Sequence, residues 1–367
     1  MAIRLIALDL DGTLLNSQGL LSAGTRAAVA AAQGRGAAVA LVTGRRFRDA
    51  RPLALELGLD VPVIAHNGAL TKHAHSLETV AATLMPVGAA RAVVRTGRAH
   101  GADALVSDDH VGAGLLVYDH ISPGNTALAK YIEWSRRVVG EDAAEAIRRV
   151  PSLEEYLDHD PLHIAFSGGC AAMEGLADVM RAELGSAVRL LLTLYPKPDF
   201  ALLDVLHPEA SKGAGLAAVA AEQGLTRDEV MAVGDNFNDL EMLEWAGTGV
   251  VMANADASLR GRGDFHATAA NDEDGVARAI ERFVLNAECG VRSDEMHSVF
   301  GSSLRTLTSA LLEEIWLTAS RTSRRTTARY VLSFWKTTRL RRRRTFGFSP
   351  RPVNTTTSSS TASSRAS

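Results

Sequence analysis

Short aliphatic runs that end in Asp, Thr or Asn recur in two separate parts of the chain. They cover residues 3–9, 37–42, 61–65, 230–235 and 248–252. Continuous apolar runs of this length are typical of strands buried on both faces of a parallel sheet. The pattern therefore predicts five parallel strands that are followed by polar residues.

Helical patterns lie between these runs. The alternation of strand and helix predicts an α/β fold with a doubly wound, mostly parallel sheet of the Rossmann type and helices on both faces. In such sheets ligands bind at the carboxyl ends of the strands. The expected helices cover 22–33 with Ser22 as N-cap, 46–57 with Pro52 inside, 211–223, and 226–229, where Thr226 and Glu229 have capping-box spacing.

The pattern changes between about residues 84 and 200. Stretches such as "GLLVYD", "PLHIAFSG", "AAMEGLADVMRAEL" and "AVRLLLTLY" indicate a separate α+β module. We therefore expect a catalytic core built from residues 1–83 and 201–288, with a cap domain inserted at 84–200. Such a cap would lie above the active-site edge as a lid.

A basic tail follows the second half of the core. Residues 289–367 contain 14 Lys/Arg and 4 Asp/Glu, whereas the rest of the chain contains 25 basic and 38 acidic residues, so the overall net charge of -3 averages two unlike segments. The tail is rich in Ser, Thr and Arg and has little periodic burial, which predicts disorder over most of it. One helix is expected at 303–317.

Composition places the protein among globular proteins. Hydrophobic residues make up 46% of the chain and there are two cysteines, too few for a disulfide framework. No run approaches the roughly 18 apolar residues that span a bilayer, and the N-terminus lacks a signal-peptide core. We expect a cytoplasmic protein without a membrane partner. Nothing in the sequence sets its oligomeric state.

The first chemical signal is "DLDGT", which follows the first predicted strand. Asp9 and Asp11 lie on the same side because side chains alternate along a strand. Mg²⁺ prefers one or two carboxylates together with water and substrate phosphate, so this pair is half of a magnesium site. A carboxylate can also attack phosphorus while a second one moves protons. Gly12 permits a tight turn, and Thr13 can donate a hydrogen bond.

A second acidic stretch, "GDNFNDLEML", supplies the other half. Asp235 ends an apolar strand, and Asn236, Asn238 and Asp239 add oxygen ligands within one turn. Acidic groups packed this densely are costly unless a cation or hydrogen bonds compensate them. A simple acidic helix start explains Asp239 but not Asp235.

Two weaker signals indicate an anion. "VTGR" places Thr43, Gly44 and Arg45 at a strand-to-helix turn, where a hydroxyl and backbone N–H groups can bind phosphate. Lys212 lies in the first turn of a predicted helix, where its charge opposes the helix dipole unless an anion compensates it. Each signal has an ordinary alternative: "VTGR" can be a routine turn, and Lys212 can be an exposed surface lysine. The histidines, among them His66 and His100, fit no compact ligand pattern.

In this order the four elements "DLDGTLLN", "VTGR", "SKGAGL" and "GDNFNDLEML" resemble the motifs of the haloacid dehalogenase (HAD) superfamily of phosphohydrolases. "HNGAL", "VMANA" and "NDEDGVARAIE" are similar to its Cof-type subgroup, whose lid is inserted between the second and third motifs. The resemblance covers roughly residues 3–285. One departure is Ala253, where relatives usually have glycine.

The resemblance implies roles for individual residues. Asp9 would be the nucleophile and a metal ligand, and Asp11 the general acid/base with its backbone carbonyl on the metal. Lys212 would neutralise the nucleophile and the transferred phosphoryl group, and Thr43 would donate to a phosphate oxygen. Asp235 would bind Mg²⁺, supported by Asp239 and Asn238. Gly44, Arg45, Asn67 and Gly68 would contact the substrate.

The expected activity is hydrolysis of a small phosphorylated metabolite, such as a sugar phosphate or phosphorylated cofactor, by a Mg²⁺-dependent phosphatase. A phosphomutase is the alternative within enzymes, although the large inserted cap and the Cof-like stretches argue against it. A second alternative is a nucleic-acid-binding protein that acts through Arg341–Arg344 and the surrounding tail, since clustered arginines bind phosphates. Apart from this tail, no nucleic-acid partner is expected.

Overall fold

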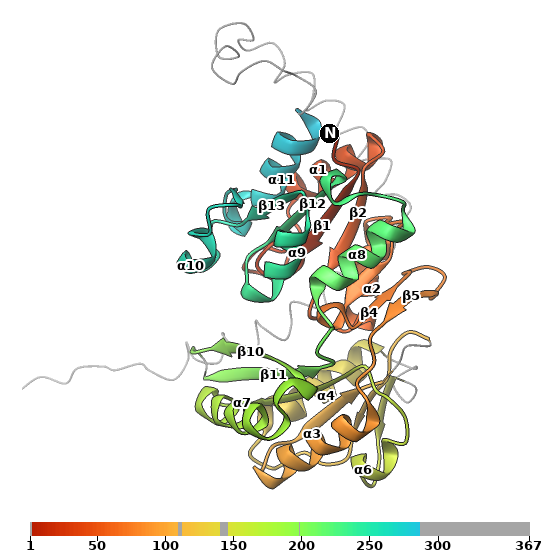
Figure 1. Ribbon diagram of the computed structural model, residues 1–367, viewed down its shortest axis with the longest axis vertical. Helices are drawn as coiled ribbons and strands as arrows, with labels where there is room; N and C mark the ends of the chain where they lie inside the picture. Colours follow the sequence, from red (N-terminus) through yellow and green to blue (C-terminus); the bar gives the residue numbers. More distant parts are fainter. Residues whose placement is uncertain (1, 109–111, 140–145, 198, 287–367) are drawn as a thin grey trace, which may run out of the picture. The chain divides into compact units, whose positions relative to one another are not determined.

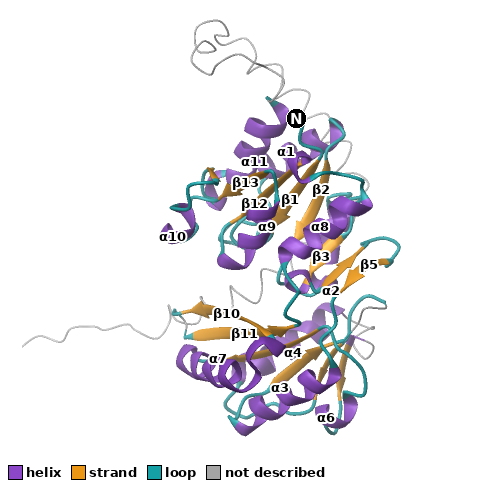
Figure 2. Ribbon diagram, in the orientation of Figure 1, coloured by secondary structure: helices purple, strands orange, loops and turns teal. Residues whose placement is uncertain are grey.

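Two β-sheets organise the chain, and each has helices packed on its faces (Figures 1 and 2). The computed structural model describes residues 2–108, 112–139, 146–197 and 199–286. These residues all belong to one compact unit. The helix expected at 303–317 and the basic tail at 289–367 lie outside the described residues.

The first sheet has eight strands in the order β14-β13-β12-β1-β2-β3-β4-β5. Strands β14 to β3 run parallel, and β4 and β5 are antiparallel additions. The five strands predicted from the aliphatic runs all form. The bounds are β1 Leu5–Asp9, β2 Ala38–Val42, β3 Val63–Ala65, β4 Leu70–Lys72, β5 Thr79–Ala82, β12 Val230–Gly234, β13 Thr248–Val251 and β14 His266–Ala267.

Alternate side chains of β1 enter two different cores, one on each face of this sheet. Ile6 and Leu8 pack in a cluster with residues of α1, α2 and α11, whereas Leu5 and Ala7 pack with residues of α8 and α9. Burial on both faces explains why these strands are continuously apolar. The helices are α1 Ala23–Gly34, α2 Phe47–Glu56, α8 Lys212–Glu222, α9 Leu240–Trp245, α10 Ala257–Arg260 and α11 Gly275–Ile280.

The expected helix starts are present. Ser22 caps α1 by accepting from the Thr25 N–H, and Ser211 caps α8 by accepting from the Ala214 N–H. Thr226 and Glu229 form a reciprocal capping box, but on a single 3₁₀ turn. Pro52 lies inside α2 without ending it. The short turns are η1 His66–Gly68, η4 Arg227–Glu229, η5 Phe237–Asp239, η6 Asn271–Glu273 and the π-helical η7 Glu281–Leu285.

The second sheet has six strands in the order β10-β11-β9-β6-β7-β8, all antiparallel except the pair β7–β8. Helices α3 and α7 pack in one apolar cluster with it, and α4 packs in another over β6 to β8. The elements are α3 Val87–Ala99, β6 Ala104–Ser107, β7 Leu116–Tyr118, α4 Thr126–Val139, β8 Ile147–Arg149, α6 Leu153–Tyr156, β9 His163–Gly168, α7 Cys170–Leu184, η3 Gly185–Ala187, β10 Arg189–Tyr195 and β11 Phe200–Leu206.

The strand β11 bears on where the inserted segment ends. Its residues pair with β9 and β10, so it belongs to the second sheet. A division by sheet therefore places the return to the first sheet after Leu206, six residues later than the boundary at 200/201 expected from sequence. Among the described residues, no helix combines the length and the apolar character needed to cross a membrane.

Candidate active site

The carboxyl ends of neighbouring parallel strands bring the predicted acidic residues together. Asp9 is the last residue of β1, and Asp235 directly follows β12, its hydrogen-bonded neighbour. Asp239 lies one turn further, at the end of η5. One carboxylate oxygen from each of the three residues lies within 4.8 Å of the other two. The structure therefore brings together three of the acidic residues that the sequence analysis singled out.

Lys212, the first residue of α8, completes this cluster. Its Nζ lies 2.7 Å from Asp9 Oδ1 and 2.5 Å from Asp239 Oδ1. Its side chain is only 1% exposed, although lysine is normally a surface residue. Helix α8 begins at Lys212, so the N-cap at Ser211 fixes where the ammonium group enters the site.

The electrostatics of the cluster depend on burial. Burial raises the pKa of Asp9 well above its usual range; Lys212 opposes this rise, and Asp239 and Asp235 add to it. Burial and then Asp239 raise the pKa of Asp235 to about 6. Burial alone would lower the pKa of Lys212, but Asp239 and Asp9 hold it above its usual value. Lys212 therefore stays charged, and its single positive charge offsets the negative charge of only one of the three carboxylates.

This donor set fits a divalent cation. When ionised, the three carboxylates and one ammonium group leave an excess of two negative charges in a largely buried space. Carboxylate oxygens are the ligands that Mg²⁺ prefers. Both oxygens of Asp239 already accept hydrogen bonds, Oδ1 from Lys212 and Oδ2 from the backbone N–H groups of Asp235 and Asn236. Asp9, whose Oδ1 accepts from Lys212, therefore has more free oxygen capacity than Asp239.

Two glycines allow the backbone to approach these carboxylates. Gly12 has a φ of +88°, and a Cβ there would lie 2.2 Å from Asp235 Oδ2. A Cβ on Gly234 would lie 2.6 Å from the Asp239 side chain. Thr13 donates its hydroxyl to Asp235 Oδ1 at 3.0 Å. The tight turn and the donor expected in "DLDGT" are thus both present.

Asp11 does not join the three-carboxylate cluster through its side chain. That side chain is 60% exposed and accepts two hydrogen bonds from Arg45, from Nε at 2.7 Å and from Nη2 at 2.5 Å. The two residues were predicted separately, Asp11 as acid/base and Arg45 as a substrate contact. The structure instead brings them together as a bidentate ion pair.

The remaining predicted residues meet around η1. The Thr43 hydroxyl accepts from the Arg45 N–H, and the Thr43 carbonyl accepts from the Asn67 N–H. Asn238 donates Nδ2 to Asn67 Oδ1 at 3.0 Å, which links this turn to the loop after β12. At Gly44 and Gly68 the backbone lies too close to its neighbours for a larger residue. A Cβ on Gly44 would lie 3.0 Å from Asn67 Oδ1, and a Cβ on Gly68 would lie 1.9 Å from Ser211 O.

Asn254 is a contact that the sequence reasoning missed. Its Nδ2 donates to Gly12 O at 2.8 Å and to Asp235 Oδ2 at 3.3 Å. Asn254 is the asparagine of "VMANA", the stretch in which Ala253 departs from the family pattern. Ala253 is not among the residues with positive φ, so its Cβ is compatible with the backbone at this position.

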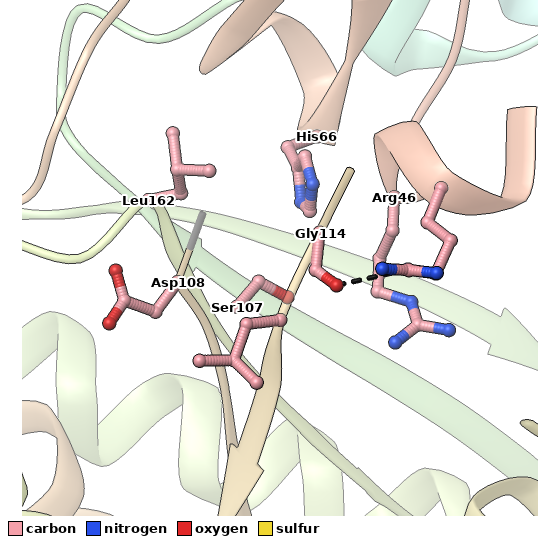
Figure 3. Close-up of a pocket in the computed structure, with 8 residues that line it drawn as sticks. Arg46, His66, Ser107, Asp108, Gly114 and Leu162 are labelled. Carbon is pink, nitrogen blue, oxygen red and sulfur yellow. Dashed lines mark hydrogen bonds between the residues drawn. The ribbon is translucent and has the colours of Figure 1, made fainter. Parts of the chain in front are cut away.

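A small pocket lies away from the acidic cluster, where side chains from both sheets meet. Its lining joins Arg46, Arg48 and His66 to Ser107, Asp108, Gly114, Leu115 and Leu162. Figure 3 shows His66 between Leu162 and Arg46 in this view. The Arg48 Nε donates to Gly114 O at 3.0 Å. None of the three clustered aspartates lines this pocket.

Comparison with known proteins adds independent information. The sequence matches the family of haloacid dehalogenase-like hydrolases over residues 6–280. YbhA of Escherichia coli (strain K12), a pyridoxal phosphate phosphatase, is 30% identical over 290 residues, which cover 76% of this chain and 98% of that protein. YcsE of Bacillus subtilis (strain 168), a 5-amino-6-(5-phospho-D-ribitylamino)uracil phosphatase, is 30% identical over 283 residues, or 77% and 96% of the two chains.

The fold has similar solved structures as well. The crystal structure of a haloacid dehalogenase-like hydrolase from Bacteroides thetaiotaomicron is 26% identical and superposes with a TM-score of 0.63. The match covers 76% of this chain and 99% of that one.

Proposed function

Because the chain belongs to the haloacid dehalogenase-like hydrolase family, we propose that it is a Mg²⁺-dependent phosphatase that hydrolyses small phosphorylated metabolites through an aspartyl-phosphate. Membership confirms the resemblance seen in the four motifs, the α/β fold class and the assignment as a hydrolase. The observation that carries the proposal is the contact of Lys212 with Asp9 inside a cluster of three carboxylates.

The metal requirement follows from that cluster. Asp9, Asp235 and Asp239 would hold Mg²⁺, and the backbone carbonyl of Asp11 is a further expected ligand. Bound there, Mg²⁺ would offset the repulsion between the carboxylates and a substrate phosphate. Asp239 would also orient Lys212, since it accepts from Nζ with one oxygen and from two backbone N–H groups with the other.

Asp9 would act as the nucleophile in the first step. One of its carboxylate oxygens forms a bond to phosphorus while the bond from phosphorus to the ester oxygen breaks. The leaving oxygen takes a proton from Asp11. Lys212 donates hydrogen bonds beside the attacking oxygen, and the Thr43 hydroxyl, which accepts from the Arg45 N–H, can donate its own proton to a phosphate oxygen.

In the second step Asp11 would take a proton from water, whose oxygen attacks phosphorus. The bond from phosphorus to Asp9 breaks, which releases inorganic phosphate and restores the carboxylate. Asp11 is exposed and paired with Arg45 in this structure, so both steps require Arg45 to release one carboxylate oxygen.

The proposed substrate class comes from the relatives. YbhA and YcsE are named for phosphate esters of small ring-containing metabolites. The second sheet would supply contacts to the leaving group, since Tyr195 in β10 lies close enough to Asp11 and Asp235 for their charges to act on its hydroxyl. After burial, the charge of Asp11 is the next cause of the raised pKa of Tyr195.

A substrate screen tests this proposal. The full-length chain is incubated with p-nitrophenyl phosphate, sugar phosphates and phosphorylated cofactors, with Mg²⁺ or with EDTA. We expect inorganic phosphate to be released only with Mg²⁺. Formation of an isomeric sugar phosphate without free phosphate would indicate a mutase instead, and absence of turnover with every ester would refute the proposal.

A further inference from the structure

A buried chain of hydrogen bonds joins the two sheets next to the candidate site. The Nδ1 atoms of His66 and His163 lie 3.4 Å apart, and His163 Nε2 lies 2.9 Å from Asp204 Oδ1. His66 belongs to η1 of the first sheet's region, whereas His163 and Asp204 lie on β9 and β11 of the second sheet. Both imidazoles are buried, with 4% and 5% of each residue exposed.

Neighbouring groups fix the direction of these hydrogen bonds. The Phe47 N–H donates to His66 Nε2 at 3.4 Å, so this nitrogen carries no proton. A neutral His66 must then carry its proton on Nδ1 and donate it to His163 Nδ1. His163 in turn carries its proton on Nε2 and donates it to the Asp204 carboxylate. In this arrangement each of the four ring nitrogens of His66 and His163 has a hydrogen-bond partner.

The neutral state of His66 agrees with its surroundings. Burial, then His163, then Arg46 lower the pKa of His66 well below its ordinary value. An additional proton on Nε2 of His66 would face the Phe47 N–H, so the geometry also favours the neutral His66 ring.

His66 also lies in an unusual backbone conformation. His66 and Asn67 are consecutive non-glycine residues with φ of 51° and 52°. Residues other than glycine are strained in this left-handed region, and such conformations persist where surrounding contacts hold them. The Asn67 side chain is held by Asn238, and the His66 side chain by His163.

We propose that His66, His163 and Asp204 are positioning residues, which hold the turn at Asn67 in place for phosphate binding and couple it to the second sheet. This inference rests on the proposed function, because Asn67 and its neighbour Thr43 are the groups expected near the substrate phosphate. The Asn67 N–H donates to Thr43 O, so displacement of the turn would also displace Thr43.

Two substitutions at His163 separate its two hydrogen bonds. His163→Asn places an acceptor near the position of Nδ1 and keeps the contact with His66. His163→Gln reaches the position of Nε2 and keeps the contact with Asp204 but leaves the His66 N–H without an acceptor. His100→Gln is the control, because the His100 ring bonds the Thr96 carbonyl at the end of α3 and contacts no residue of the candidate site in the described part of the chain.

We expect kcat of His163→Gln to fall about tenfold with KM changed less than threefold, because an unpaired buried donor and a misplaced turn weaken transition-state contacts. His163→Asn should recover most of this loss, and His100→Gln should equal wild type. A merely structural contact would instead lower the melting temperature and leave kcat per folded molecule unchanged, and that result would overturn the proposal.

A measurement on the full-length wild-type chain tests the hydrogen-bond direction without reference to activity. Long-range ¹⁵N–¹H spectra of the histidines at pH 7.5 should show His66 protonated on Nδ1 and His163 on Nε2. The reverse tautomers, or a doubly protonated ring, would overturn the proposed chain of hydrogen bonds. Absence of Mg²⁺-dependent turnover in the wild type would refute the proposed function and the positioning role with it, whatever the tautomers are.

Discussion

The ammonium group of Lys212 bridges Asp9 and Asp239, at 2.7 Å and 2.5 Å, inside the protein. Asp9 is the last residue of β1, Asp239 is the last residue of η5, which follows the neighbouring strand β12, and the lysine is the first residue of α8. All three residues are 7% exposed or less. Charges buried in this way depend on their partners, so removal of one has a large effect.

Replacement of the lysine tests this dependence. Lys212→Met should lower the free energy of unfolding by about 3–5 kcal/mol in EDTA, because it leaves buried carboxylates without their cation. Urea denaturation followed by circular dichroism gives the value. Lys130→Met, at an exposed position of α4, is the control and should change stability by less than about 0.5 kcal/mol. Equal effects of the two substitutions would contradict the role of Lys212.

The approach of Gly12 to Asp235 gives a second test. Gly12→Ala introduces a Cβ 2.2 Å from Asp235 Oδ2, whereas Gly19→Ala meets nothing within 4 Å although its φ is also positive, at +72°. Both should lose about 1–2 kcal/mol of stability from the left-handed backbone. Only Gly12→Ala should require at least tenfold more Mg²⁺ for half-maximal turnover. A similar Mg²⁺ requirement in both variants would show that Asp235 does not bind the metal.

The approach of Asp9 to Asp235 could be predicted from sequence, because both end apolar runs and parallel strands share one carboxyl edge. Lys212 gives a weaker signal, because its place in the first turn of a predicted helix indicates an anion but does not identify its partners. The pairing of Asp11 with Arg45 could not be predicted, because the exposed Asp11 carboxylate and the long Arg45 side chain can each reach several partners. Its detection required the side-chain positions.

The chain of hydrogen bonds through His66, His163 and Asp204 shows a different limit of prediction from sequence. His66 and His163 are 97 residues apart and belong to different sheets. No periodicity or spacing connects them, and His66 gave no ligand pattern in the sequence. Only the packing of β9 against η1 creates the contact. The assignment of β11 meets a related limit, since an apolar strand carries no mark of which sheet it joins.

Stability should depend on pH through His66. The pKa of His66 is lowered in the folded protein, whereas an unfolded histidine titrates near 6.5. As pH falls below about 6.5, the unfolded chain takes up a proton that the folded chain does not, so the free energy of unfolding falls by up to about 1.4 kcal/mol per pH unit. The charges of His163 and Arg46 act on His66, and Arg48 and Asp108 line the same pocket. Asp49 and Asp204 are the ion-pair partners of Arg46 and His163.

Comparison of wild type with His66→Asn isolates this contribution. Asparagine does not titrate and accepts the left-handed backbone better than most residues. The difference in unfolding free energy between the two proteins, measured by urea denaturation at pH 7.5, 6.5 and 5.5, should shrink as pH falls. A difference that stays constant over this range would mean that His66 titrates normally in the folded protein.

The tail distinguishes the phosphatase from a nucleic-acid-binding protein. A chain that ends at residue 288 keeps every residue of the candidate site and the whole family match at 6–280. Its kcat/KM on p-nitrophenyl phosphate should remain within twofold of the full-length value. If turnover is absent in both chains and binding to nucleic acid disappears with the tail, the alternative function is correct.

The most direct test of the central claim is identification of the phosphorylated residue. The full-length chain and Asp9→Asn are mixed with ³²P-labelled substrate and Mg²⁺, quenched in acid within milliseconds, digested and analysed by mass spectrometry. The account predicts label on the peptide that contains Asp9 in wild type, no label in Asp9→Asn, and a fall in kcat of at least about 10³-fold. Label on another residue, or near-normal turnover by Asp9→Asn, would contradict it.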